Sequence, residues 1–256
     1  MPLSPQDWHH RFQIQSQWTR DTRLHLYNRL GTLSGKRVLD VGCGTGVLSQ
    51  ELNQLSGEEI IGLDFNIDFL EIAASQSPSN KLVLADAHTM PFKADAIDCS
   101  VCHYLLLWVD NPSMVINEMV RVTKPGGAVL ALAEPDYGGR IDYPQEFSIL
   151  GEIQESALHN QGADPLMGRK LSGLLHQSGL TEIEVGVIGA QWYGIPSENH
   201  FDSEWEILQS DLESLNENSE VIQTPEDLRQ AELASWASGE RILYVPTFYA
   251  WGRVSD

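Results

Sequence analysis

Residues 38–46 read Val38-Leu39-Asp40-Val41-Gly42-Cys43-Gly44-Thr45-Gly46, a short apolar run that leads into a glycine-rich turn. The apolar run predicts a buried strand, and the pattern of residues 46–55 predicts a helix after the turn. Glycines at positions 42, 44 and 46 allow a tight turn and let a ligand approach the backbone. The stretch therefore predicts a strand, a turn and a helix, with a nucleotide-like cofactor bound at the turn.

The following hundred or so residues alternate between strand-like and helix-like patterns. Alternating strands and helices predict a mainly parallel sheet that helices cover on both faces. The expected strands lie at 37–41, 59–64, 82–85, within 97–107 and at 128–133, and the expected helices lie at 6–30, 46–55, 67–75 and 112–123.

The second half of the chain departs from this alternation. Helical patterns occupy residues 145–161 and 165–178, whereas residues 181–192 and 242–254 predict two long strands that pair antiparallel at the sheet edge. Between these strands, residues 197–239 are acidic and helical. The expected parts are an N-terminal helical cap at 1–35, a core at 36–192, a helical insertion or lid at 193–240 and a final core strand at 241–256.

The overall charge argues against several classes of partner. The chain has 36 acidic and 16 basic side chains, a formal net charge of −20 at pH 7. Nucleic acids and anionic lipids are normally bound by a basic face, so we expect neither as a substrate. No apolar run approaches the roughly 18 residues of a membrane span, and the polar N-terminus is not typical of a secretory signal.

Three cysteines are too few for a disulfide framework, which favours the reducing cytoplasm. Cys99 and Cys102 form a CxxC spacing that could indicate a metal or redox pair. They lie in an apolar, strand-like run, and residues three apart on a strand point to opposite faces. We therefore expect no metal site there.

Two aspartates stand at the carboxyl ends of expected strands. Asp64 ends the second strand, where a carboxylate can accept hydrogen bonds from two ribose hydroxyls. Asp86, followed by Ala87, ends the third strand, where a carboxylate can accept from an adenine amino group. The turn has the spacing GxGxG, not the GxGxxG of dinucleotide enzymes. Turn and carboxylates together favour a cofactor that contains adenosine.

On these residues the sequence resembles the class I S-adenosylmethionine-dependent methyltransferases, in particular the small-molecule group that includes the quinone-biosynthesis C-methyltransferases. The similarity rests on four motifs in the same order, at 38–46, 62–64, 85–92 and 121–127. The resemblance implies a three-layer, doubly wound α/β fold with a seven-stranded, mostly parallel, Rossmann-like sheet whose last strand is antiparallel. It also implies N-terminal helices, a helical insertion before the last strand, and S-adenosylmethionine as the cofactor.

The resemblance further implies cofactor contacts, carried over position by position. The turn would hold the methionine part, Asp64 the ribose, and Phe65 and Asp86 the adenine. Trp18 would pack on the cofactor and Arg23 or Arg20 would meet its carboxylate, the alternatives being a plain core contact and surface charges. The expected contacts are Trp18, Arg23, Asp40, Gly42, Cys43, Gly44, Gly46, Asp64, Phe65, Asp86, Ala87, Cys102 and His103.

Methyl transfer from a sulfonium is an in-line displacement, so the protein mainly holds donor and acceptor together and excludes water. A general base is needed only for an acceptor that must lose a proton. Candidates are His103, Glu134 and Tyr143. His103 is the first choice because the pKa of a free histidine lies near neutrality. The alternative is a histidine that only packs beside the cofactor.

The expected function is methyl transfer to a small organic acceptor by a cytoplasmic monomer or homodimer. We expect the acceptor pocket to be formed by the N-terminal helix together with residues 134–143 and 197–239. Two alternatives stay open: a catalytically silent protein that binds the cofactor as a partner or scaffold, and a nicotinamide-dependent oxidoreductase. The turn spacing and the pair Asp86-Ala87 disfavour the oxidoreductase.

Overall fold

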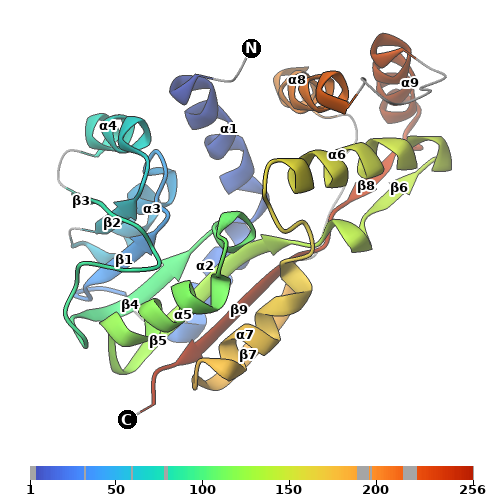
Figure 1. The fold of residues 1–256 in the computed structure, drawn as a ribbon. Helices are drawn as coiled ribbons and strands as arrows, with labels where there is room; N and C mark the ends of the chain where they lie inside the picture. The colour runs from blue at the N-terminus through green and yellow to red at the C-terminus, as the bar shows by residue number, and fades with distance from the viewer. Residues whose placement is uncertain are drawn as a thin grey trace. The chain divides into compact units, whose positions relative to one another are not determined.

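A seven-stranded sheet organises the first of two units in the computed structural model, which describes residues 4–31, 33–58, 60–77, 80–188, 196, 198–215 and 224–255 (Figure 1). The first unit comprises 1–134, 167–188 and 247–256, and the second comprises 135–166 and 189–246. The strands in spatial order are β3 (Lys81–Leu84), β2 (Ile61–Asp64), β1 (Val38–Val41), β4 (Ile97–Cys102), β5 (Thr123–Pro135), β9 (Thr247–Arg253) and β7 (Thr181–Ile188).

The parallel pairing of β1, β2 and β4 places their carboxyl ends at the same edge of the sheet. β1 pairs in parallel with β2 and with β4, Asp40 lying opposite Gly62 and Val41 opposite Cys102. β9 pairs antiparallel with β7. β9 is also antiparallel to β5. The N–H of Gly126, near the start of β5, donates to the carbonyl of Val254, just after the end of β9. The predicted mostly parallel, seven-stranded sheet is confirmed.

The prediction of one long strand over residues 242–254 is wrong. The structure divides this segment into β8 (Ile242–Tyr244) and β9, which belong to different sheets. Pro246 lies between them, and proline cannot donate to a strand ladder. The final core strand is therefore shorter than predicted, and β8 pairs with a strand, β6 (Ile141–Tyr143), that the sequence did not reveal.

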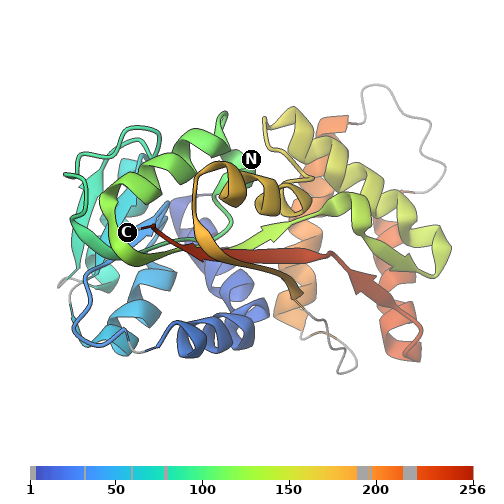
Figure 2. The ribbon, with the colours of Figure 1, turned by 90° about the horizontal axis from the view of Figure 1, so that it is seen from below.

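Helices cover both faces of the large sheet, with α2 (Arg20–Leu30) and α3 (Val47–Ser56) on one face and α5 (Pro112–Val122) and α7 (Leu171–Gln177) on the other (Figure 2). Apolar side chains of α2 and α3 form one core cluster with residues of β1, β4 and β5. Burying such side chains is the main stabilising contribution to a fold of this kind. The cluster contains Leu26, Tyr27, Leu30, Leu33, Val38, Leu48, Leu52, Ile60, Cys99, Val101, Ala128, Leu130, Leu132 and Trp251.

Two further helices of the first unit lie near the glycine turn. These are α1 (Pro5–Trp18), which begins with a capping box between Ser4 and Asp7, and α4 (Ile67–Gln76), which Asn66 caps. A hydroxyl or amide oxygen at such a position satisfies N–H groups that have no partner inside the helix. Short 3-10 turns follow β4 as η1 (Leu106–Trp108) and precede α7 as η4 (Gly168–Lys170). None of the described helices has the length and apolar character needed to cross a membrane.

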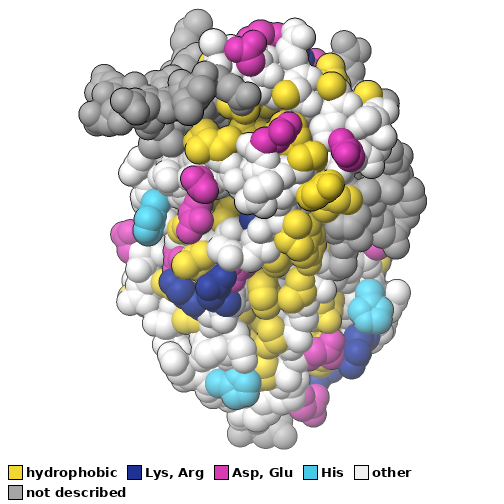
Figure 3. All heavy atoms as spheres, turned by 90° about the vertical axis from the view of Figure 1, so that its right-hand side faces the viewer, with side chains coloured by type: hydrophobic (Ala, Val, Ile, Leu, Met, Phe, Trp, Pro, Cys, Tyr) yellow, Lys and Arg dark blue, Asp and Glu magenta, His cyan; other side chains and the backbone are white. Residues whose placement is uncertain are grey.

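The second unit has its own core and its own two-stranded sheet, β6 with β8. Its helices are α6 (Ser148–Asn160), α8 (Glu198–Leu215) and α9 (Pro225–Ser238), with 3-10 turns η2 (Tyr137–Gly139) and η3 (Gln145–Phe147). The helical pattern predicted for 197–239 is confirmed over the described parts. Two large hydrophobic side chains of this unit, Ile141 and Tyr143, are exposed. Figure 3 shows a face of the molecule where hydrophobic side chains gather.

Candidate functional site

The glycine turn after β1 has the conformation that its glycines allow. Gly42, Gly44 and Gly46 have φ angles of +70°, +52° and +81°. L-residues with a Cβ rarely adopt this left-handed region. The N–H groups of Gly42 and Cys43 both donate to the carbonyl of Leu63, at 2.7 and 3.0 Å. The turn is therefore tied to the neighbouring strand β2.

Three elements pack closely against the turn. A Cβ on Gly42 would lie 2.7 Å from Leu105 Cδ1, in the segment after β4. A Cβ on Gly44 would lie 3.3 Å from the ring of Phe12 in α1, and one on Gly46 would lie 3.0 Å from the Cβ of Ala73 in α4. The turn requires glycine both for its conformation and because these neighbours leave no room for a larger residue.

Asp64, the last residue of β2, also holds the turn. One carboxylate oxygen accepts from the N–H of Gly44 and the other from the N–H of Asn66, both at 2.8 Å. Burial raises the pKa of Asp64, while these backbone donors act in the opposite direction. A carboxylate has about four acceptor positions, so further donors can still be accepted. The residue is 7% exposed.

Asp40 lies beneath the turn and has almost no exposed surface. Ser49, in α3, donates its hydroxyl to Asp40 Oδ2 at 2.6 Å. Burial raises the pKa of Asp40 to about 7, and the nearby charge of Asp64 acts in the same direction. Because Asp40 is enclosed beside Ser49, it supports the turn, and its predicted contact with the cofactor stays a prediction.

The carboxyl ends of β2 and β3 present exposed groups. Phe65 follows Asp64 and is 78% exposed, an unusual position for a large aromatic side chain. Asp86 lies two residues beyond the end of β3 and accepts from the backbone N–H and the ring of His88 at 2.8 and 2.7 Å. The backbone hydrogen bond from His88 is the main cause that lowers the pKa of Asp86. Ala87, next to it, is buried.

Helix α1 closes over the glycine turn. His9 Nδ1 lies 2.8 Å from Thr45 Oγ1, and the amide nitrogen of Gln13 lies 3.1 Å from His9 Nε2. Because an amide nitrogen donates, the His9 ring accepts at Nε2 and donates from Nδ1 to Thr45. Phe12 packs edge-on against Phe69 of α4, with ring centroids 5.6 Å apart. The contacts of His9 with Thr45 and of Phe12 with Phe69 were not predicted, because they join residues that are far apart in the sequence.

The predicted contact of Arg23 with a cofactor carboxylate finds no support in the geometry. The Arg23 side chain is buried and forms a fork with Glu51, at 2.9 and 2.7 Å. It also donates to the carbonyl of Ser16 and to Thr19 Oγ1. Its donors are thus directed at protein groups and join α2 to α3, and its predicted contact with the cofactor stays a prediction. Trp18 is 42% exposed at the end of α1, and its predicted stacking on the cofactor stays a prediction.

Two candidate residues stand at the end of β4. Cys102 is the last residue of the strand and its side chain has no exposed surface, and its predicted contact with the cofactor stays a prediction. His103 Nε2 lies 2.8 Å from Thr19 Oγ1. Burial, with the charge of Arg23 as a second cause, lowers the pKa of His103 to about 3. The reason for preferring His103 as a general base, a pKa near neutrality, therefore does not hold.

The other two base candidates occupy unlike environments. Glu134 is fully buried, and its carboxylate accepts from the backbone N–H groups of Leu105, Leu106 and Leu107. Burial raises the pKa of Glu134 to about 8, while these backbone donors act in the opposite direction. Tyr143 lies on β6 in the second unit and is 54% exposed. Its predicted catalytic role stays a prediction.

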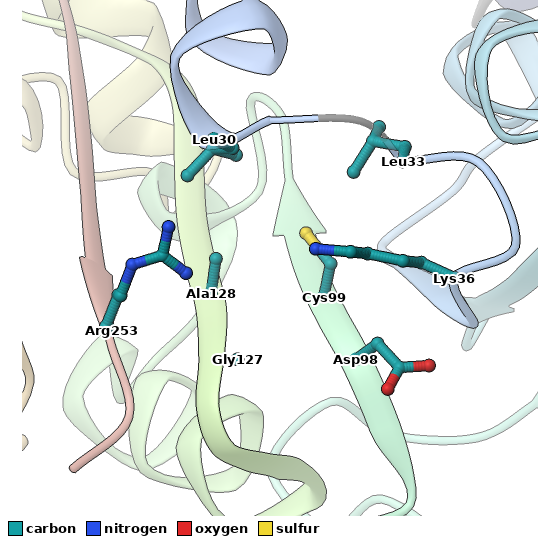
Figure 4. Close-up of a pocket in the computed structure, with 8 residues that line it drawn as sticks. All are labelled: Leu30, Leu33, Lys36, Asp98, Cys99, Gly127, Ala128 and Arg253. Atoms are coloured by element: carbon teal, nitrogen blue, oxygen red, sulfur yellow. The ribbon is translucent and has the colours of Figure 1, made fainter.

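The CxxC pair spans the length of β4. Cys99 and Cys102 are both buried, and burial raises the pKa of each thiol. A cavity of about 10 Å³ lies at the opposite, amino ends of β4 and β5, which is room for about one water molecule and not for a cofactor (Figure 4). It is lined by Leu30, Leu33, Lys36, Asp98, Cys99, Gly127, Ala128 and Arg253.

Comparison with known proteins points to one family. Residues 39–131 match the model of a methyltransferase domain. A demethylmenaquinone methyltransferase of Lysinibacillus sphaericus is 30% identical over 190 residues, which cover 67% of this chain and 80% of that protein. The demethylmenaquinone methyltransferase of Renibacterium salmoninarum is 33% identical over 122 residues, 47% of this chain and 51% of its own length. The chain thus spans about half the length of several of the curated relatives it matches.

Solved structures agree on the fold. A phosphoethanolamine N-methyltransferase of Haemonchus contortus, solved with S-adenosyl-L-methionine, superposes with a TM-score of 0.59 at 16% identity. The match covers 92% of this chain and 53% of that one. At this level of identity the likeness concerns the architecture alone.

Proposed function

Because the chain belongs to the class I S-adenosylmethionine-dependent methyltransferases, we propose that it transfers a methyl group to a small organic acceptor by in-line displacement. The observation that carries the proposal is the join between the glycine turn and Asp64. This carboxylate at the end of β2 accepts from the N–H of Gly44 and retains acceptor positions of its own. A turn and a carboxylate in this relation suit a ligand that has both a ribose and a charged tail.

The residues present fit the cofactor. The left-handed glycines form a tight turn whose conformation a residue with a Cβ rarely adopts, and Leu105, Phe12 and Ala73 pack against it. Asp64 would accept from the ribose hydroxyls. The exposed ring of Phe65 would lie against the adenine, with Asp86 accepting from its amino group.

S-adenosylmethionine supplies an electrophilic methyl carbon and a neutral thioether leaving group when it is bound. The protein's part is to hold the reactants in line and exclude water. Helix α1, anchored to the turn through His9 and Thr45, would screen the bound cofactor from solvent. Burial lowers the pKa of His103, so a neutral His103 ring would add no positive charge to the site that holds the sulfonium.

The acceptor is proposed only as a class. The relatives are named for demethylmenaquinone and the structural neighbour for phosphoethanolamine, two chemically unlike acceptors. Because a lowered pKa makes His103 a weak base and Glu134 is engaged by backbone donors, we favour an acceptor that is already nucleophilic, such as a neutral amine or a carboxylate. Such an acceptor needs no general base.

Calorimetry with S-adenosylhomocysteine, the demethylated product, tests the cofactor. We expect binding to the purified protein, and lack of binding of both S-adenosylmethionine and its product would refute the proposal. Transfer of a labelled methyl group to a fraction of cellular metabolites tests catalysis. Cofactor binding without transfer would instead support the silent partner protein.

A further inference from the structure

The last residues of β5 hold a neighbouring segment through its backbone. Glu134 is fully buried, and its carboxylate accepts from three consecutive N–H groups, those of Leu105, Leu106 and Leu107, at 3.1, 2.8 and 3.1 Å. These groups lie at the start of the 3-10 turn η1, where N–H groups have no partner within the turn itself. The Glu134 side chain therefore provides the acceptor for all three N–H groups at the start of η1.

The residue before this run is held in the same way. The N–H of Tyr104 donates to the carbonyl of Ala133 at 2.9 Å. Tyr104 has a φ angle of +51°, a left-handed conformation that is unfavourable for a residue with a Cβ. Ala133 and Glu134 together thus hold four consecutive N–H groups and keep the backbone in a conformation that it would not adopt alone.

Segment 103–107 consists of His103 and these four residues. It makes one contact with the glycine turn and one with the N-terminal helices. Leu105 packs so closely on Gly42 that a Cβ there would lie 2.7 Å from its Cδ1. His103 Nε2 lies 2.8 Å from Thr19 Oγ1, at the junction of α1 and α2. Movement of the segment would therefore disturb the wall of the turn and the anchor of the N-terminal helices together.

We propose that Glu134 is a positioning residue, which fixes segment 103–107 so that the glycine turn and the N-terminal helices keep the geometry that binds the methyl donor. The proposal rests on the proposed function, because it assigns Glu134 to the cofactor site. It replaces the role of general base that the sequence suggested for this residue, since the Glu134 carboxylate accepts from three backbone donors and has no exposed surface.

The experiment compares Glu134→Gln with Glu134→Asp. The Gln side chain has nearly the same shape, but its amide nitrogen cannot accept, so at least one backbone N–H loses its partner. The Asp side chain keeps both acceptors and is one methylene shorter. We expect amides 104–107 to exchange with solvent at least about tenfold faster in Glu134→Gln, and the Kd for S-adenosylhomocysteine to rise by a similar factor. Glu134→Asp should recover part of both.

Two control variants separate positioning from lost stability. Asp98→Asn alters another carboxylate that accepts a backbone N–H, that of Arg37, at the opposite end of the sheet. Val115→Ala removes buried apolar volume from α5. Neither should change the Kd, measured well below the Tm of each variant. If Glu134→Gln also unfolds too readily to study, the Glu134→Asp variant alone must show faster exchange and weaker binding.

Two results would overturn the inference. Faster exchange of amides 104–107 with an unchanged Kd would make Glu134 a merely structural residue, and unchanged exchange would show that it does not hold the segment. Failure of the unaltered protein to bind S-adenosylhomocysteine would refute the proposed function. The positioning role would be refuted as well. Amide exchange would still show whether Glu134 restrains the backbone of residues 104–107.

Discussion

Asp64 Oδ2 accepts a hydrogen bond of 2.8 Å from the N–H of Gly44, so the carboxylate expected to bind the ribose also shapes the glycine turn. Its other oxygen accepts from the N–H of Asn66, the residue that caps α4. Truncating the residue to alanine would therefore remove a ligand contact and two structural contacts at once.

An isosteric change gives a sharper result. In Asp64→Asn the amide nitrogen cannot accept from the N–H group that it faces, and the charge is lost. We expect the Kd for S-adenosylhomocysteine to rise at least about tenfold, as measured by calorimetry. Asp68→Asn, an exposed aspartate in the first turn of α4, is the matched control and should bind as the unaltered protein does. Equal affinity in both variants would contradict the ribose assignment.

The contact between His9 and Thr45 predicts that loss of the His9 side chain weakens the attachment of α1 to the glycine turn. His9→Ala removes the hydrogen bond of 2.8 Å and leaves the buried Thr45 hydroxyl without that partner. We expect a loss of about 1–2 kcal/mol in the free energy of unfolding and faster proteolysis within α1. His10→Ala, the exposed neighbour, should do neither. Equal proteolysis of both variants would show that His9 does not anchor the helix.

The stability of the protein should depend on pH through Asp40. Burial raises its pKa to about 7, above the value of about 3.9 in an unfolded chain. Between these values the folded state binds more protons than the unfolded state, so the free energy of unfolding falls as pH rises from about 4 to 7. Asp40→Asn removes this contribution and should flatten the curve.

Urea unfolding measures the effect at pH values from just above the isoelectric point, about 4.6, to about 7. Asp64 and Glu134 also have raised pKa values, so some dependence should persist in Asp40→Asn. The exposed Asp68→Asn variant should retain the full dependence. If the curve of Asp40→Asn is as steep as that of the unaltered protein, Asp40 does not titrate in this range.

The fork between Arg23 and Glu51 predicts a structural role for the arginine. Arg23→Lys keeps the charge and loses the fork, so the Tm should fall. Affinities for S-adenosylhomocysteine and for 5′-methylthioadenosine, which lacks the amino-acid tail, should change by the same factor. A loss confined to S-adenosylhomocysteine would show that Arg23 meets the carboxylate after all. Arg20→Lys, at an exposed position in α2, should leave the Tm unchanged.

The core of the second unit contains a buried network around Arg241. Its guanidinium bonds Glu232 at 2.9 Å and Asp142 at 2.6 Å and lies over the ring of Phe147. Arg241→Met would leave the buried Glu232 without its cation, whereas Asp142 would keep its ion pair with Arg140. Removing one partner of a buried ion pair typically costs about 3–5 kcal/mol. Urea unfolding should detect this loss.

A partly exposed ion pair in the same unit provides the comparison. Arg229 bonds Asp202 at 2.5 Å, with both side chains in contact with solvent. Such pairs are worth about 0–1 kcal/mol, so Arg229→Met should be nearly neutral. Similar losses in the two arginine variants would contradict the assignment of the Arg241 network as the buried core of the unit.

Much of the fold could be predicted from the sequence because its signals are local. Gly42, Gly44 and Gly46 specify a left-handed turn by the absence of a Cβ, whatever surrounds them. The alternation of apolar runs and helical patterns specified parallel strands, and the carboxylate that ends β2 marked one side of the proposed cofactor site. Pro246 was as local a signal, and it was missed as the break between β8 and β9.

Only the tertiary structure decided what the other polar residues do. Arg23 meets Glu51, His9 meets Thr45, and Glu134 meets the N–H groups of residues 105–107, all pairs that lie 27 or more residues apart. Burial in the folded chain also changes pKa values, because it lowers the pKa of His103 and raises that of Asp40. Residue type alone indicates a possible base or cation. Its neighbours and its loss of water determine whether it can act as one, and these are properties of the folded chain.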